Sequence, residues 1–140
     1  MPTAPRLILA SASPARLKTL QNAGLSPEVI VSGVDESTVA KTGPADYTMR
    51  LAQLKAVAVA ADQKRAIVIG CDSVLALDGE ILGKPGTEEE AIERWQQMRG
   101  RSGVLRRSTG QPAKPRTQAA SSPAAARRRG KENGEDVIAT

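Results

Sequence analysis

The sequence contains no histidine and no phenylalanine, and it has one cysteine, one tryptophan and one tyrosine among its 140 residues. The absence of histidine excludes a histidine general base and the usual histidine-containing zinc sites. The single Cys71 has no partner for an internal disulfide. Acid–base chemistry in this chain therefore falls to carboxylates, lysines or a metal-bound water.

Long apolar runs are also absent. No stretch of about 18 residues is continuously apolar, and no basic segment followed by an apolar one opens the chain. We therefore expect a cytoplasmic protein that does not enter a membrane. The length suits one domain with a modest core.

The net charge of +5 is unevenly distributed. Residues 1–98 carry 10 Lys and Arg against 12 Asp and Glu, a balance of −2, whereas residues 99–140 carry 10 against 3, a balance of +7. After Leu105 the β-branched apolar residues are Val137 and Ile138 alone. We therefore predict a folded domain over residues 1–103 and a mostly disordered basic tail over residues 104–140.

A buried strand leading directly into a helix is predicted for residues 7–16. Apolar residues run from Leu7 to Leu9, Ser13 is a suitable N-cap, and Pro14 suits the first helical position. The start of a helix favours an anion, and the hydroxyls of Ser11 and Ser13 and the guanidinium of Arg16 add donors there. The stretch is a candidate phosphate site, with an ordinary capped helix and a surface arginine as the alternative.

The most apolar run, Ala66 to Cys71, predicts a central strand covered on both faces, ending at Asp72-Ser73. A carboxylate at such a position is costly unless it is paired or bound to a cation. Asp72 is therefore a candidate for chemistry, and a turn or cap aspartate is the alternative.

Further elements are predicted along the chain. A strand over residues 28–32 precedes Asp35-Glu36, and a helix over residues 45–62 carries Lys55 beside an apolar stripe (Met49, Leu51, Leu54, Val57 and Ala58). Lys55 either extends along the helix surface or faces a cleft.

Asp78-Gly79 predicts a hairpin, and the following Gly-Lys-Pro turn carries Lys84. A capping box at Thr87 opens a last helix to about Arg99, with its core-facing positions at Ile92, Trp95 and Met98.

Five segments in order, from Leu7 to about Gly103, resemble the Maf family of nucleoside triphosphate pyrophosphatases. They are the Ser-x-Ser-Pro segment with Arg16, Val34-Asp35-Glu36, the helix with Lys55, Asp72-Ser73, and the turn with Lys84. The predicted order of strands and helices and this resemblance both imply an α/β fold, with a central mixed sheet flanked by helices and a cleft where strand ends meet helix starts.

The resemblance implies hydrolysis of a nucleoside triphosphate between its α and β phosphates. Carried over by position, it implies Asp72 as the catalytic proton acceptor and Glu36 with Asp72 as ligands of Mg²⁺ or Mn²⁺. The substrate-binding residues that it implies are Ser11, Ser13, Arg16, Lys55, Ser73 and Lys84. Ala15 stands where the family usually has an arginine, and Ser73 where it has a threonine.

The resemblance ends after Gly103, which suggests a truncated or frameshifted member lacking the carboxyl-terminal part of the fold. Such a chain would expose sheet edges and apolar helix faces and favour association, for example as a homodimer. Two alternatives to the enzyme follow. One is an inactive member that binds only a nucleotide or a partner. The other is a nucleic-acid-associating protein acting through Arg127-Arg128-Arg129, although the tail has no aromatic residue for base stacking.

Overall fold

The computed structural model describes residues 4–112 and, as backbone only, residues 135–139. These residues form an α/β fold with a mixed sheet, as the sequence predicted. The elements are β1 (Arg6–Leu9), α1 (Pro14–Asn22), β2 (Glu28–Val29), the 3₁₀ turn η1 (Glu36–Thr38), α2 (Pro44–Ala60), β3 (Ala66–Leu77), β4 (Glu80–Leu82), α3 (Glu88–Met98), β5 (Ser102–Gly110) and β6 (Glu135–Ala139).

The strands follow the order β2-β1-β3-β5-β6, with β4 also pairing with β3. β1 is parallel to β2 and β3, whereas the β3–β4, β3–β5 and β5–β6 pairs are antiparallel. β3 and β4 form the predicted hairpin, in which Leu77 pairs with Glu80 and Asp78-Gly79 makes the turn. Positive φ values of 47° at Asp78 and 84° at Gly79 suit the turn that Asp-Gly favours.

The long strand β3 organises the sheet because different strands pair with its two halves. Residues 66–69 pair with β1, residues 70–76 pair with β5, and residues 75–77 pair with β4. Since β5 already pairs with one edge of residues 70–76, β4 must lie along the same edge as β1. The β1 side of β3 therefore has a gap between Ile69 and Leu75, where no described strand pairs with it.

The expected strand end at Asp72-Ser73 is wrong, because β3 continues to Leu77. The run Val74–Leu77 is itself β-forming and gains partners in both β4 and β5. It is the pairing with β1 that stops before Asp72. The side chains near Asp72 accordingly lie at the gap rather than beyond the sheet.

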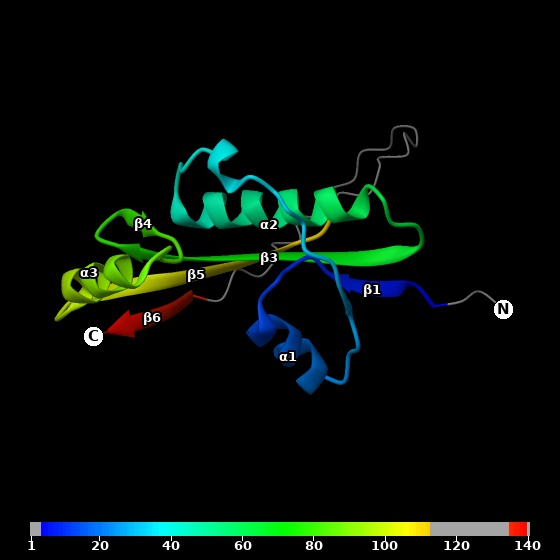
Figure 1. The fold of residues 1–140 in the computed structure, drawn as a ribbon, viewed down its shortest axis with the longest axis horizontal. Coiled ribbons are helices and arrows are strands. Elements are labelled where there is room, and N and C mark those ends of the chain that lie inside the picture. The colour runs from blue at the N-terminus through cyan, green and yellow to red at the C-terminus, as the bar shows by residue number, and fades with distance from the viewer. Residues whose placement is uncertain (1–3, 113–134, 140) are drawn as a thin grey trace, which may run out of the picture.

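Helix α2 covers one face of the sheet and runs along β3 (Figure 1). Its buried positions are Tyr47, Thr48, Leu51, Ala52, Ala56 and Val59. Of the predicted stripe, Leu51 is buried and Met49 and Leu54 are half-buried, whereas Val57, at 50% exposed, and Ala58 face outward. The helix approaches so closely that a Cβ on Gly70 would lie 2.8 Å from the Ala56 backbone nitrogen, so small residues rather than large ones define this contact.

The opposite face of the sheet is covered much less than predicted. Helix α1 lies on this side (Figure 1), but none of its residues is buried. Ile67 of β3 is 45% exposed. The unbroken apolar run in β3 predicts burial on both faces, but among the described residues this face is covered only in part, with Leu77 buried and Ile69 half-buried.

Helix α3 begins as predicted, with the Thr87 hydroxyl accepting from the Glu90 backbone N–H at 3.2 Å. Its expected core face is wrong, because Ile92 is 51% exposed and Trp95 is 66% exposed. The amphipathic spacing identifies an apolar face but does not establish that another element covers it.

Residues 104–110 are a strand and not part of a disordered tail. They pair with β3 from Val104 opposite Ala76 to Gly110 opposite Gly70. The buried positions of β5 are small or polar, such as Gly103, Ser108 and Gly110. The low apolar content of this segment therefore gave no sign that part of it would be buried. The division into a folded domain and a disordered tail stays a prediction, because residues 113–134 lie outside the described part of the chain.

Candidate functional site

A cavity of about 510 Å³ lies at the gap in the edge of β3. The segment between β1 and α1 contributes Ser11 and Ser13 to it, and β3 contributes Asp72 and Ser73. It is lined by all eight of the residues that the sequence singled out, namely Ser11, Ser13, Arg16, Glu36, Lys55, Asp72, Ser73 and Lys84. The structure thus brings together side chains from five separate segments.

Arg16 joins the start of α1 to the open edge of β3. One guanidinium nitrogen, Nη1, donates to the Ser11 hydroxyl and to the Cys71 carbonyl, each at 3.1 Å. The other, Nη2, donates to the Ser73 hydroxyl at 3.1 Å. Arg16 therefore satisfies a backbone carbonyl at the gap and positions two of the cavity's hydroxyl groups.

The helix start behaves as predicted. The Ser13 hydroxyl accepts from the Arg16 backbone N–H at 3.4 Å, and Pro14 occupies the first turn. Gly24, with a φ of 80°, ends the helix in a left-handed conformation. The capping therefore fixes the position of the first turn of α1, from which Arg16 reaches β3.

Lys55 projects from the buried face of α2 and pairs with two carboxylates at once. Its Nζ lies 2.9 Å from Asp72 Oδ1 and 2.7 Å from Glu36 Oε1. The side chains of Lys55 and Asp72 are 13% and 10% exposed, whereas that of Glu36 is 50% exposed. Lys55 thus faces the cleft, and the alternative of a lysine extended along the helix surface is wrong.

Burial has opposite consequences for the two partners in the deeper pair. Burial raises the pKa of Asp72 above its ordinary value, and although the hydrogen bond from Lys55 opposes this, burial outweighs it. Burial lowers the pKa of Lys55, but the hydrogen bonds to Asp72 and Glu36 outweigh it, so its pKa lies above the ordinary value. The lysine is therefore held firmly in its charged form.

Asp35, the neighbour of Glu36, lies outside the lining of the cavity and has a local structural role. Its carboxylate accepts from the Ser37 backbone N–H at 3.0 Å and from the Ser37 hydroxyl at 2.6 Å. The hydroxyl bond lowers the pKa of Asp35. This cap holds η1 and so directs Glu36 toward Lys55.

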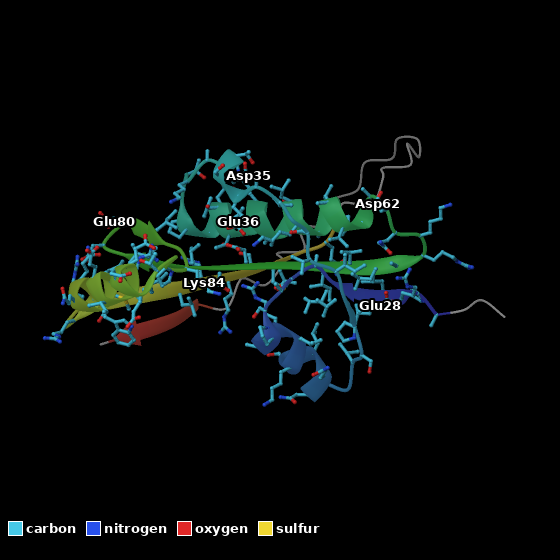
Figure 2. All side chains as sticks on the ribbon, viewed as in Figure 1. Glu28, Asp35, Glu36, Asp62, Glu80 and Lys84 are labelled. Carbon is cyan, nitrogen blue, oxygen red and sulfur yellow. The ribbon has the colours of Figure 1, made fainter. Side chains whose placement is uncertain are left out.

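The cavity carries more positive than negative charge. Figure 2 shows Glu36 beside α2 and Lys84 close to β3, and both line the cavity. The lining has four cationic side chains, Arg16, Lys41, Lys55 and Lys84, against the two carboxylates of Glu36 and Asp72. Within residues 4–112, Lys41 and Lys84 are exposed and form no ion pair with a described residue.

Sequence reasoning missed Lys41 and Tyr47. Tyr47 is 6% exposed and packs with Leu51 and Val74 into an apolar wall of the cavity. Its position was detectable, because residues 47, 51 and 55 lie four apart on one helix face, the face that carries Lys55. Lys41 lies in the loop before α2, where no spacing or motif distinguishes it.

Comparison with known proteins identifies the family. Residues 6–122 match the family described as "Maf-like protein". The chain belongs to the Maf family. The Maf chain is 59% identical over 105 residues to a protein named nucleoside triphosphate pyrophosphatase from Salinispora tropica, covering 71% of this chain and 46% of that protein.

Other relatives agree with this membership. A protein of the same name from Streptomyces avermitilis is 59% identical over 102 residues, which cover 71% of this Maf chain and 50% of the relative. One from Synechococcus elongatus is 56% identical over 104 residues, which cover 74% of this chain and 52% of that relative. The chain spans about half the length of the curated relatives that it matches.

Proposed function

We propose that this Maf chain hydrolyses a nucleoside triphosphate at the α–β phosphoanhydride, releasing a monophosphate and pyrophosphate. The observation that carries the proposal is one cavity in which four cationic side chains surround a buried carboxylate, Asp72. The matched relatives, named nucleoside triphosphate pyrophosphatases, support it. A triphosphate is strongly anionic, so the excess of positive charge suits such a substrate.

The cationic side chains have different proposed roles. Lys84 and Lys41, which form no ion pair within residues 4–112, would bind phosphate oxygens directly. Ser11, Ser13 and Ser73 would donate hydroxyl hydrogen bonds, and Arg16 would hold two of these serines in place while facing the phosphates. The apolar wall around Tyr47 would contact the nucleoside.

Asp72 is the proposed general base. It would accept a proton from the water that attacks phosphorus, the bridging P–O bond would break, and its electrons would leave with the departing phosphate group. A raised pKa brings a carboxylate closer to the proton affinity that such a base needs. Before substrate and cation bind, Lys55 would hold the Asp72 carboxylate in position.

Glu36 and Asp72 are the proposed ligands of Mg²⁺ or Mn²⁺. The pair fits a cation because both carboxylates already converge on one positive charge, the Lys55 ammonium. Mg²⁺ in proteins usually keeps several waters and substrate oxygens, so two carboxylates are enough to hold it. The cation would neutralise charge on the phosphates.

The cytoplasmic location and the homodimer also remain predictions. In the part of the chain that the structure describes, no helix has the length and apolarity needed to cross a membrane. The nucleic-acid alternative depends on Arg127-Arg128-Arg129, which lie outside the described residues, so no observation favours it.

The test is pyrophosphate release by the purified 140-residue chain, with standard and modified nucleoside triphosphates and Mg²⁺ or Mn²⁺. Asp72→Asn is expected to reduce release by roughly 10²-fold or more. Asp62→Asn is the matched control, since Asp62 lies away from Glu36 and Lys84 (Figure 2) and is exposed. Equal rates for Asp72→Asn and the unchanged chain would overturn the role of Asp72. Nucleotide binding without release would instead support the binding-only alternative.

A further inference from the structure

We propose that Lys55 is the resident counter-ion of the Glu36–Asp72 pair and has to leave this pair before a divalent cation can bind there. The inference rests on the proposed function, which assigns a divalent cation to these two carboxylates. It adds that the cation and the ammonium exclude each other, so that Lys55 controls when the cation binds.

One positive charge already lies between the two carboxylates. It is Lys55 Nζ, at 2.7 Å from Glu36 Oε1 and 2.9 Å from Asp72 Oδ1. The lysine side chain is only 13% exposed, and it extends from the face of α2 that buries Leu51 and Ala56. Its stem is therefore packed, and the ammonium cannot move far without leaving the pair.

The charges make simultaneous binding unfavourable. The two carboxylates and Lys55 together carry a charge of −1, so a divalent ion at the same pair would face a close ammonium with little compensating negative charge. Among the described residues no third metal-ligating carboxylate joins the group. The other charged residues that line the cavity, Arg16, Lys41 and Lys84, are all cationic.

The same surroundings indicate where Lys55 goes when it leaves. Because the cavity offers it no other carboxylate, any new ionic partner would be an anion that arrives with the cation. The phosphates of the substrate are such an anion. Lys55 would thus pass from the carboxylates to a phosphate oxygen, and binding of the cation would be coupled to binding of the nucleotide.

The first test measures Mn²⁺ binding to the full chain without nucleotide, from the paramagnetic resonance signal of unbound Mn²⁺. Lys55→Met is expected to bind Mn²⁺ about tenfold more tightly than the unchanged chain, and Glu36→Gln in the same background should abolish the gain. Lys41→Met removes the same charge from the same cavity without removing a carboxylate contact, so a clearly smaller change is expected. Equal or weaker binding by Lys55→Met would overturn the proposal.

A second test uses the unchanged chain, so it does not depend on whether a variant folds. Acetylation of individual lysines is followed by mass spectrometry with and without saturating Mg²⁺. Release from the carboxylates should accelerate acetylation of Lys55 severalfold, whereas Lys41 provides the internal control. An unchanged rate at Lys55 with Mg²⁺ bound would contradict the exchange. Neither test requires pyrophosphate release, so a failure of the proposed activity is distinguishable from a failure of this inference.

Discussion

The hydroxyl groups of Thr48 in α2 and Ser108 in β5 lie 2.8 Å apart in a buried hydrogen bond. Thr48 is 0% exposed and Ser108 is 3% exposed. The Thr48 hydroxyl also lies 2.9 Å from the Pro44 carbonyl and 3.1 Å from the Ala45 carbonyl. This buried hydrogen bond joins α2, the helix that carries Lys55, to β5. The composition of β5 had predicted disorder.

We expect Thr48→Val to lower the free energy of unfolding by about 1–3 kcal/mol, because it leaves the Ser108 hydroxyl buried without this partner. Ser108→Ala should also destabilise the chain. The double variant should lose less than the sum of the two single losses, since neither polar group then remains unpaired. Urea unfolding followed by circular dichroism measures all three, and strictly additive losses would contradict the coupling.

Gly70 provides a second prediction, about the contact between α2 and β3. A Cβ at this position would meet the backbone of α2, at 2.8 Å from the Ala56 nitrogen and closer still to the Ala52 carbonyl. Backbone atoms cannot move aside as a flexible side chain can. Gly70→Ala is therefore expected to cost about 3 kcal/mol or more in the free energy of unfolding.

Gly83→Ala is the matched control for Gly70, because a Cβ there meets nothing within 4 Å. Its effect on the urea midpoint should be small. A Gly70→Ala chain as stable as the Gly83→Ala chain would show that the helix can shift away from the sheet without cost.

The sequence predicted this fold well where local chemistry decides the structure. Ser13 with Pro14, Asp78 with Gly79, and Thr87 each specify a cap or turn through their own hydrogen bonds or φ preferences, and each element begins or turns there. These signals depend on a few neighbouring residues, so they can be interpreted without knowledge of the tertiary structure.

The errors arise where tertiary contacts decide. The buried face of α2 includes Ala52 and Ala56 because Gly70 and Gly110 let the backbones approach, and hydrophobic spacing alone favours the bulkier Leu54 and Val57. Strand β5 forms with little apolar content because β3 supplies its backbone partners. Lys55 pairs with Asp72, 17 positions away. The resemblance placed both residues at the site, but neither it nor helical periodicity predicted that they would pair.

Arg16 is expected to stabilise the cavity as well as face its ligand. Arg16→Lys keeps the positive charge but loses the planar arrangement that reaches Ser11, the Cys71 carbonyl and Ser73 together. We expect a loss of about 1–2 kcal/mol in the free energy of unfolding. Lys18→Gln, on an exposed position of the same helix, is the control and should change thermal stability little. A thermal unfolding midpoint of the Arg16→Lys chain equal to that of the Lys18→Gln control would show that these hydrogen bonds contribute nothing measurable to stability.

Tyr47 allows a direct optical test of the charges at the site, because it is the only tyrosine in the chain. Burial raises its pKa, and the negative charges of Glu36 and Asp72 raise it further, while Lys55 opposes them. The phenol in the folded chain should therefore ionise at a higher pH than in the chain unfolded in urea, where its ordinary pKa of about 10 applies.

The sign of the effect on stability follows from this raised pKa. The stabilising contribution of the protonated phenol is fully present below the unfolded-state pKa, and it is lost as the pH rises through the folded-state pKa. Ultraviolet absorbance of the phenolate measures both midpoints. Glu36→Gln should lower the folded midpoint because it removes one of the nearby negative charges, whereas Asp62→Asn should leave it unchanged. A folded midpoint no higher than the unfolded one would mean that Tyr47 is neither buried nor close to the carboxylates of the cavity.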